Sequence, residues 1–228
     1  FAGILGSRGA FTFTVTVLVG LAVIAFVVFV EQAQRRVPVQ YAKRMVGRRM
    51  YGGTSTYIPL KVNMAGVIPV IFASSLLFLP TLFVQLTGSQ AAWAQWVQQN
   101  FGTGSGTWYL LTYFLLVIFF CYFYVSITFN PTDVADNMKK YGGFIPGIRA
   151  GKPTADYLDY VLTRLTAPGS LYLGLIAVLP VFAFGGLGVA GDFIFGGTSL
   201  LIMVGVGLDT VKQIESQLQQ RNYEGFLG

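Results

Sequence analysis

Residues 31–79 read EQAQRRVPVQYAKRMVGRRMYGGTSTYIPLKVNMAGVIPVIFASSLLFL. The first part is polar and basic, and an apolar run begins at Asn63 without a linker. No acidic residue follows Glu31 until Asp133, so the basic side chains between them have no acidic partner close in sequence. There are seven of them: Arg35, Arg36, Lys43, Arg44, Arg48, Arg49 and Lys61. The stretch predicts a basic loop, facing the cytoplasm or an anionic partner, joined directly to a membrane-spanning helix.

The apolar run after Asn63 contains two prolines and the small polar pair Ser74 and Ser75. Proline removes a helix hydrogen bond, and serine hydroxyl groups in a membrane need a hydrogen-bond partner inside the protein. We therefore expect a spanning helix over residues 63–86 with an interrupted backbone and with hydroxyl groups that point toward a polar surface. A simpler alternative for Asn63 is that it caps this helix, as asparagine often does.

The composition indicates a membrane protein. Of the 228 residues, 54% are hydrophobic and only 11% are charged, whereas about a quarter of the residues of a soluble domain are charged. The net charge of +6 fits the bias of Lys and Arg toward cytoplasmic loops better than it fits nucleic-acid binding. The chain has no histidine, and its one cysteine, Cys121, lies inside an apolar run. We expect a buried thiol and no catalytic activity, metal site or cofactor.

Five apolar runs are long enough to cross a bilayer as helices, since about 20 residues span the ~30 Å hydrocarbon core. They cover residues 11–30, 63–86, 108–129, 168–184 and 193–211. The segments before, between and after them carry one, seven, none, five, none and two basic residues. By the positive-inside rule, loops 31–62 and 130–167 and the C-terminus lie in the cytoplasm. The first ten residues are expected to be the tail of a preceding segment.

The second basic loop has an irregular centre, YGGFIPGIRAGKP, at residues 141–153. Its glycines and prolines exclude a regular helix or strand and predict a tight exposed loop that presents Ile148 and Arg149 at its tip. The apolar periodicity of the following residues, 154–166, predicts a short amphipathic helix that leads into the span at 168–184.

The same sequence suggests several other functions. Two Gly-rich aspartates, Asp192 and Asp209, suggest an intramembrane aspartyl protease, but about 25 Å of helix would separate them, so a shared-proton pair is excluded. Half of a small-solute transporter remains an alternative, although transporters place polar groups mid-span and these spans are apolar there. A non-conducting membrane scaffold for the translation machinery is a third possibility, but it does not explain the prolines of residues 63–86.

Four long runs resemble the SecY family, the channel subunits of the bacterial protein translocase. They are VEQAQRRVPVQYAKR at 30–44, GRRMYGGTSTYIPLKVNMAGVIPVIFASSLL at 47–77, FNPTDVADNMKKYGGFIPGIRAGKPTADYLDYVLTRLT at 129–166 and FGGTSLLIMVGVGLD at 195–209. SecY proteins have ten spans in two pseudo-symmetric halves, and this chain resembles spans six to ten. The resemblance implies an all-α integral membrane protein whose five helices form half of a ten-helix clam-shell channel. The first half is expected outside this sequence.

The resemblance also implies roles for individual residues. In the family, unfolded polypeptides cross between the two halves, and signal sequences leave sideways through a lateral gate. Ile71 and Ile202 match the pore ring, whose branched apolar side chains exclude ions and deform around a passing chain. The matching gate positions are Asn63, Ser74, Ser75 and Leu76. Without the resemblance, single apolar residues such as Ile71 would be interpreted as packing residues.

The two basic loops resemble those that bind the SecA motor and the ribosome. The matching contact residues are Lys43, Arg44, Arg48, Arg49 and Arg149. Arginine forms bidentate bonds to carboxylates and to phosphates, so it suits both partners. On charge alone, Arg48 and Arg49 would instead be anchors to anionic lipids. The further implied partners are the SecE and SecG subunits, signal peptides, unfolded preproteins, the bilayer of the bacterial plasma (inner) membrane and the first half of the channel.

Overall fold

The structure is a computed structural model that describes residues 2–41, 44–46, 49–51, 55–88, 91–102, 106–186 and 197–224. Its helices are α1 (Ala2–Gln32), α2 (Ile68–Thr87), α3 (Ala92–Phe101), α4 (Thr107–Thr128), α5 (Pro131–Lys140), α6 (Lys152–Gly186) and α7 (Gly197–Glu224). Its strands are β1 (Gln34–Tyr41), β2 (Arg44–Val46), β3 (Arg49–Tyr51), β4 (Ser55–Lys61) and β5 (Gly143–Phe144). A helix lies at each predicted span. In the span at residues 193–211, the described part of the helix begins at Gly197.

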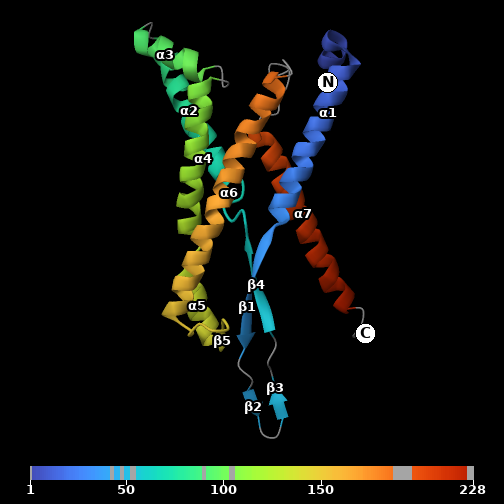
Figure 1. Cartoon of the computed structure of the whole chain (residues 1–228), viewed down its shortest axis with the longest axis vertical. Helices are drawn as coiled ribbons and strands as arrows, with labels where there is room; N and C mark the ends of the chain where they lie inside the picture. The colour runs from blue at the N-terminus through green and yellow to red at the C-terminus, as the bar shows by residue number, and fades with distance from the viewer. Residues whose placement is uncertain are drawn as a thin grey trace.

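The long helices run roughly along the long axis of the molecule (Figure 1). Within the described residues, three helical stretches are long and apolar enough to cross a membrane: Ile68–Thr87, Thr107–Lys140 and Lys152–Phe182. A shorter apolar stretch, Val17–Gln32, lies in α1. The N-terminus and α3 lie at one end of the molecule, while the strands, α5 and the end of α7 lie toward the other.

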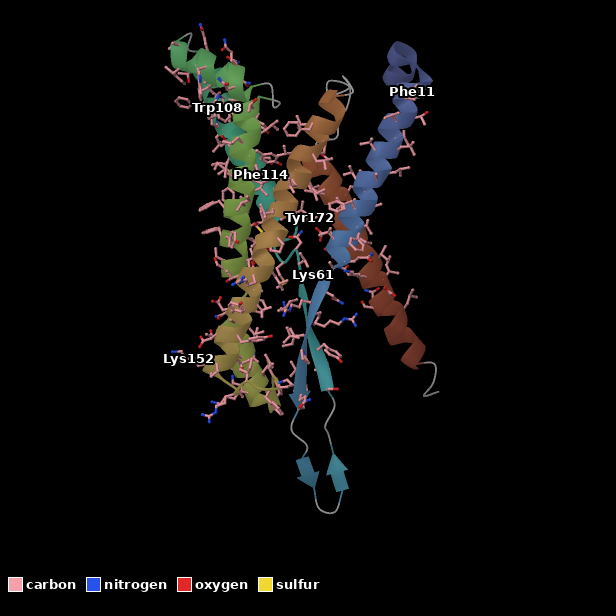
Figure 2. All side chains as sticks on the ribbon, viewed as in Figure 1. Phe11, Lys61, Trp108, Phe114, Lys152 and Tyr172 are labelled. Atoms are coloured by element: carbon pink, nitrogen blue, oxygen red, sulfur yellow. The ribbon has the colours of Figure 1, made fainter. Side chains whose placement is uncertain are left out.

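The apolar core lies where α4 and α6 pack against α2 and α7. A Cβ atom added to Gly174 of α6 would come within 2.7 Å of two ring carbons of Phe114 on α4, so the two helices approach closely at this glycine. Figure 2 shows Phe114 and Tyr172 in the middle part of the molecule. The most buried core residues include Val70, Val117, Leu173, Ile176 and Leu201. Cys121 is also buried, as predicted.

The predicted basic loop at residues 31–62 contains a β-hairpin, which the sequence analysis did not predict. Strand β1 pairs antiparallel with β4 from Gln34–Lys61 to Gln40–Ser55, and also pairs with β5. Buried side chains on β1 and β4 contact a second core cluster that includes residues of α5 and α6. The strands form because distant helices cover one face of the hairpin. The two basic loops therefore meet in one sheet, which agrees with the expectation that they lie on one side.

The second loop differs from the prediction in three details. Residues 141–153 were expected to contain no regular strand, but Gly143–Phe144 form β5. The expected amphipathic helix is not separate, because α6 runs from Lys152 through Pro168 to Gly186 without a break. Ile148 is not presented at the tip of the loop; it is half-buried and packs against the second core cluster. Arg149 is exposed, as predicted.

Two segments outside the predicted spans also contain helix. The connection over residues 87–107 includes α3, and α7 continues beyond residue 211 as far as Glu224. The side chains of Val211, Ile214 and Leu218 on this part of α7 are more than half exposed. The residues after the predicted span 193–211 therefore continue α7 in the same helix.

Candidate functional site

An open groove of about 630 Å³ lies between the start of α2 and α7. Ile71 of α2 and Ile202 of α7 both line it, so the structure brings the two predicted pore-ring residues to one cavity. Their side chains are 42% and 36% exposed. The helices approach closely beside them, since a Cβ added to Gly205 of α7 would lie 3.0 Å from Cγ2 of Val67. The groove therefore presents branched apolar side chains from two different helices.

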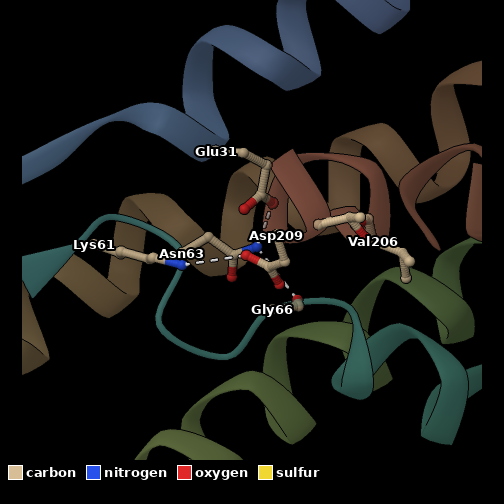
Figure 3. Close-up of polar contacts among 7 residues, drawn as sticks. Glu31, Lys61, Asn63, Gly66, Val206 and Asp209 are labelled. Atoms are coloured by element: carbon tan, nitrogen blue, oxygen red, sulfur yellow. Dashed lines mark hydrogen bonds and ion pairs between the residues drawn. The ribbon is translucent and has the colours of Figure 1, made fainter. Parts of the chain in front are cut away.

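The polar side of the groove is formed by Glu31, Lys61, Asn63 and Asp209 (Figure 3). The Asn63 Nδ2 group donates to Glu31 Oε1 at 2.6 Å and to the Gly66 carbonyl oxygen at 3.3 Å. The Lys61 ammonium lies 3.7 Å from Asp209 Oδ1. Lys61 therefore has an acidic neighbour from α7, which corrects the expectation that this basic segment lacks one.

Asn63 lies in the turn that precedes α2 and not on the helix itself. The helix begins at Ile68, because Gly66 adopts a positive φ of 63° that ends the preceding turn. The residue at the N-cap is Val67, and no side chain caps the helix, so the capping alternative for Asn63 is wrong. Asn63 is only 4% exposed, and its Oδ1 atom has no hydrogen-bond partner among the described residues.

Glu31 and Asp209 were not among the predicted site residues. Glu31 directly follows the apolar run 11–30, and burial raises the pKa of its carboxyl group above the ordinary value. The hydrogen bond from Asn63 and the charge of Lys61 act in the opposite direction. The sequence signal was the position of each carboxylate at the end of an apolar run, but sequence alone does not show that the two ends meet.

Ser74 and Ser75 make hydrogen bonds within α2, and Ser74 also lines an open pocket with the polar residues Thr81, Gln85 and Gln98. Both hydroxyl groups donate to the carbonyl oxygen of Ile71, at 2.9 and 2.8 Å. These bonds stay within α2, and such back-bonding often bends a helix. Both serines therefore have a hydrogen-bond partner inside the protein, which is the backbone of α2 itself.

Leu76 lies further along α2 and is 43% exposed. It belongs to an apolar surface with Leu79, Pro80 and Phe83. Pro80 cannot donate the helix hydrogen bond to the Leu76 carbonyl group, yet α2 continues to Thr87. The helix is thus locally weakened but not interrupted, and the four predicted gate residues do not form a single cluster.

The loop that carries Arg149 is fixed by short contacts. The Thr154 hydroxyl group donates to the Arg149 carbonyl oxygen at 2.8 Å, and the Ile148 amide donates to the Ile145 carbonyl oxygen at 3.0 Å. Ile145 is 4% exposed and belongs to the second core cluster. An exposed guanidinium group is therefore presented on a packed loop.

Of the remaining predicted contact residues, Arg44 lies on β2 and Arg49 lies on β3, and these two strands pair with each other. Arg44 pairs with Tyr51 and Arg49 pairs with Val46 in the backbone ladder, and their side chains are outside the described structure. Lys43 and Arg48 lie outside the described residues. Within the described part of the chain, no group of His, Cys, Asp and Glu residues is arranged to hold a metal ion.

A family model for SecY matches residues 2–211. The chain belongs to the SecY family. It is 70% identical over 220 residues to a protein translocase subunit SecY from Streptomyces griseus, an alignment that covers 96% of this chain and 50% of that protein. It is 64% identical over 232 residues to the SecY subunit of Mycobacterium bovis strain ATCC BAA-935 / AF2122/97, covering 98% of this chain and 53% of the relative. The chain thus spans about half the length of the curated relatives it matches.

Solved structures support the same fold. A protein-conducting channel matches 87% of this chain and 48% of its own chain, with a TM-score of 0.58 and 20% identity. A SecY channel structure concerned with how the plug domain stabilises the closed state matches 94% of this chain and 52% of its own, with a TM-score of 0.60 and 19% identity. The predicted SecY membrane fold is confirmed and is mostly helical, although it includes the strands β1–β5. The solute-transporter alternative has no support in these comparisons.

Proposed function

We propose that this chain forms the second half of a SecY channel through which unfolded polypeptides cross the plasma membrane. The observation that carries this proposal is the groove that Ile71 and Ile202 line together from α2 and α7. Branched apolar side chains at a constriction exclude hydrated ions by dewetting, yet they yield when a polypeptide passes. In this proposal the first half of the channel supplies the opposite side of the ring.

Helix α2 acts as the lateral gate through which signal sequences and hydrophobic helices enter the bilayer. Three features support this role. Ser74 and Ser75 bond back to the Ile71 carbonyl group, Pro80 removes one backbone hydrogen bond, and the surface around Leu76 is apolar and exposed. A helix with these features bends at low cost and presents an apolar surface to a leaving helix.

The strand end of the molecule faces the cytoplasm and binds the SecA motor and the ribosome, and the C-terminus lies on the same side. This orientation follows from the alternating distribution of Lys and Arg. The pairing of β1 with both β4 and β5 supports one composite docking surface from the two basic loops. SecE and SecG are the proposed membrane partners. The protein acts as a channel and not as an enzyme, and it needs no cofactor.

The experiment is ion conductance of the full-length channel, reconstituted in planar bilayers without substrate. Ile71→Gly combined with Ile202→Gly removes both branched side chains from the groove, so we expect a continuous ion leak that the parent lacks. Ile127→Gly is the control, because Ile127 is an exposed apolar residue of α4 that does not line the groove. A double variant as tight as the parent, or a control that leaks equally, would contradict the pore assignment.

A further inference from the structure

The turn at residues 62–67, from which α2 starts, is held by contacts to α1. The Val62 amide donates to the Ala33 carbonyl oxygen at 3.0 Å, just after the end of α1. The Asn63 side chain donates to the Glu31 carboxylate at 2.6 Å, and Asn63 is almost fully buried. One backbone bond and one side-chain bond therefore join this turn to the end of α1.

Two other helices press on the same turn. A Cβ added to Gly169 of α6 would lie 2.5 Å from the Val62 carbonyl oxygen, so only glycine allows this approach of two backbones. On α7, a Cβ added to Gly205 would lie 3.0 Å from Cγ2 of Val67, so this helix also approaches the turn, here through a side chain. The turn is thus enclosed by α1, α6 and α7, and its position is set by all three.

The pore-ring residues are both close to this turn. The Ile71 amide donates to the Val67 carbonyl oxygen at 3.3 Å, so Ile71 is one helical turn from the anchored segment. Ile202 is one turn before Gly205 on α7, the glycine that contacts Val67. A shift of the turn would therefore move Ile71 relative to Ile202.

We propose that Glu31 is a positioning residue of the pore: by accepting the hydrogen bond of Asn63, it fixes the turn at residues 62–67 and thereby the spacing of Ile71 and Ile202. This inference rests on the proposed channel function. In this arrangement the first turn of α2 is a fixed pivot, and gate movement occurs in the part of the helix that follows, toward Pro80. Glu31 acts on the pore ring through Asn63, and it also lines the polar side of the groove.

The bond between Glu31 and Asn63 is the contact with the largest expected effect. It is short, partly buried and made to an ionisable carboxyl group, and hydrogen bonds to charged groups are about twice as strong as neutral ones. The Oδ1 atom of Asn63 already has no partner among the described residues, so loss of this bond would leave the buried amide group with only its 3.3 Å bond to the Gly66 carbonyl oxygen. The Lys61–Asp209 pair is 3.7 Å apart and largely exposed, and such pairs contribute little.

The test compares four single variants of the full-length channel by substrate-free ion conductance, with export of a preprotein as the second measurement. Glu31→Ala removes the acceptor, and we expect the leak to rise about tenfold, since losing one hydrogen bond to a charged group shifts a two-state population by that order. Glu31→Gln keeps an acceptor oxygen, and its ion leak should be no higher than that of the parent. Gly169→Ala forces the turn away from α6 and should leak with Glu31 intact. Gln32→Ala changes the exposed residue next to Glu31, and its ion leak should equal that of the parent.

Each pattern of results has one meaning. A leak in Glu31→Ala and Gly169→Ala that is absent from Glu31→Gln and Gln32→Ala supports the positioning role. A leak in Gly169→Ala without one in Glu31→Ala would mean that packing alone sets the pivot, and it would overturn the role of Glu31. Equal leaks in Glu31→Ala and Glu31→Gln would also overturn it. If the unsubstituted channel fails to export the preprotein, the proposed function itself is wrong.

Discussion

The junction between the β1–β4 hairpin and α6 offers a direct test of how the basic loops are held. Leu158 of α6 is fully buried in the second core cluster, where it packs with Val37 and Val39 of β1 and with Leu60 of β4. Leu158→Ala removes side-chain volume at the centre of this cluster. The hairpin is expected to detach from α6 more often, because this contact covers its apolar face.

The size of the effect follows from the burial of the side chain. Replacing a fully buried leucine with alanine costs about 2–5 kcal/mol, so the opened population of the hairpin should rise at least about 30-fold. Amide hydrogen exchange on β1 and β4 of the full-length protein measures this opening directly. We expect faster exchange in both strands and little change in α4, which lies in the other core cluster.

The matched control is Asp159→Ala, because Asp159 is the next residue of α6 and its side chain is exposed. Its exchange rates should equal those of the parent. If Leu158→Ala leaves the exchange of β1 unchanged, the hairpin is stable through its own backbone ladder, and the packing argument is refuted. The proposed docking surface would then not depend on α6.

Three further predictions concern the proposed partners and the gate. Reversal of Arg48 and Arg49 to Glu should weaken ribosome binding strongly at low salt and less as salt rises, since charge attraction is screened over about 8 Å at physiological ionic strength; binding that is insensitive to the reversal would remove these residues from the surface. Arg149→Lys keeps the charge but loses the planar guanidinium group with its paired N–H donors, so SecA-driven export should fall with an unchanged salt dependence. Export equal to that of the parent would show that the charge or the backbone of this loop is sufficient for SecA binding. A cysteine at Leu76, crosslinked to a helix of the first half, should stop export, whereas full export after complete crosslinking would contradict the assignment of α2 as the gate.

The membrane class and a helix at each predicted span follow from the sequence, whereas α3 and α5 were not predicted. Hydrophobic run length determines whether a helix can cross a bilayer, and this property is local, so α2 and α4 begin and end within about five residues of the predicted spans 63–86 and 108–129. The long irregular motifs were sufficient for the SecY resemblance, which the family match over residues 2–211 bears out. The burial of Cys121 was also predictable, because its neighbours along the chain are apolar.

Features made by residues far apart in the chain required the tertiary structure. The β1–β4 hairpin was missed because its buried face is covered by α5 and α6, which occur about a hundred residues later. Asn63 was predicted to lie on or to cap α2, but it binds Glu31 from α1 in a turn that also touches α6. No acidic residue is close to Lys61 in the sequence, but in the structure Asp209 of α7 lies 3.7 Å from it. Local sequence determines which segments become helices, whereas the packing of those helices determines which polar groups meet, because hydrogen bonds and ion pairs act only over a few ångströms.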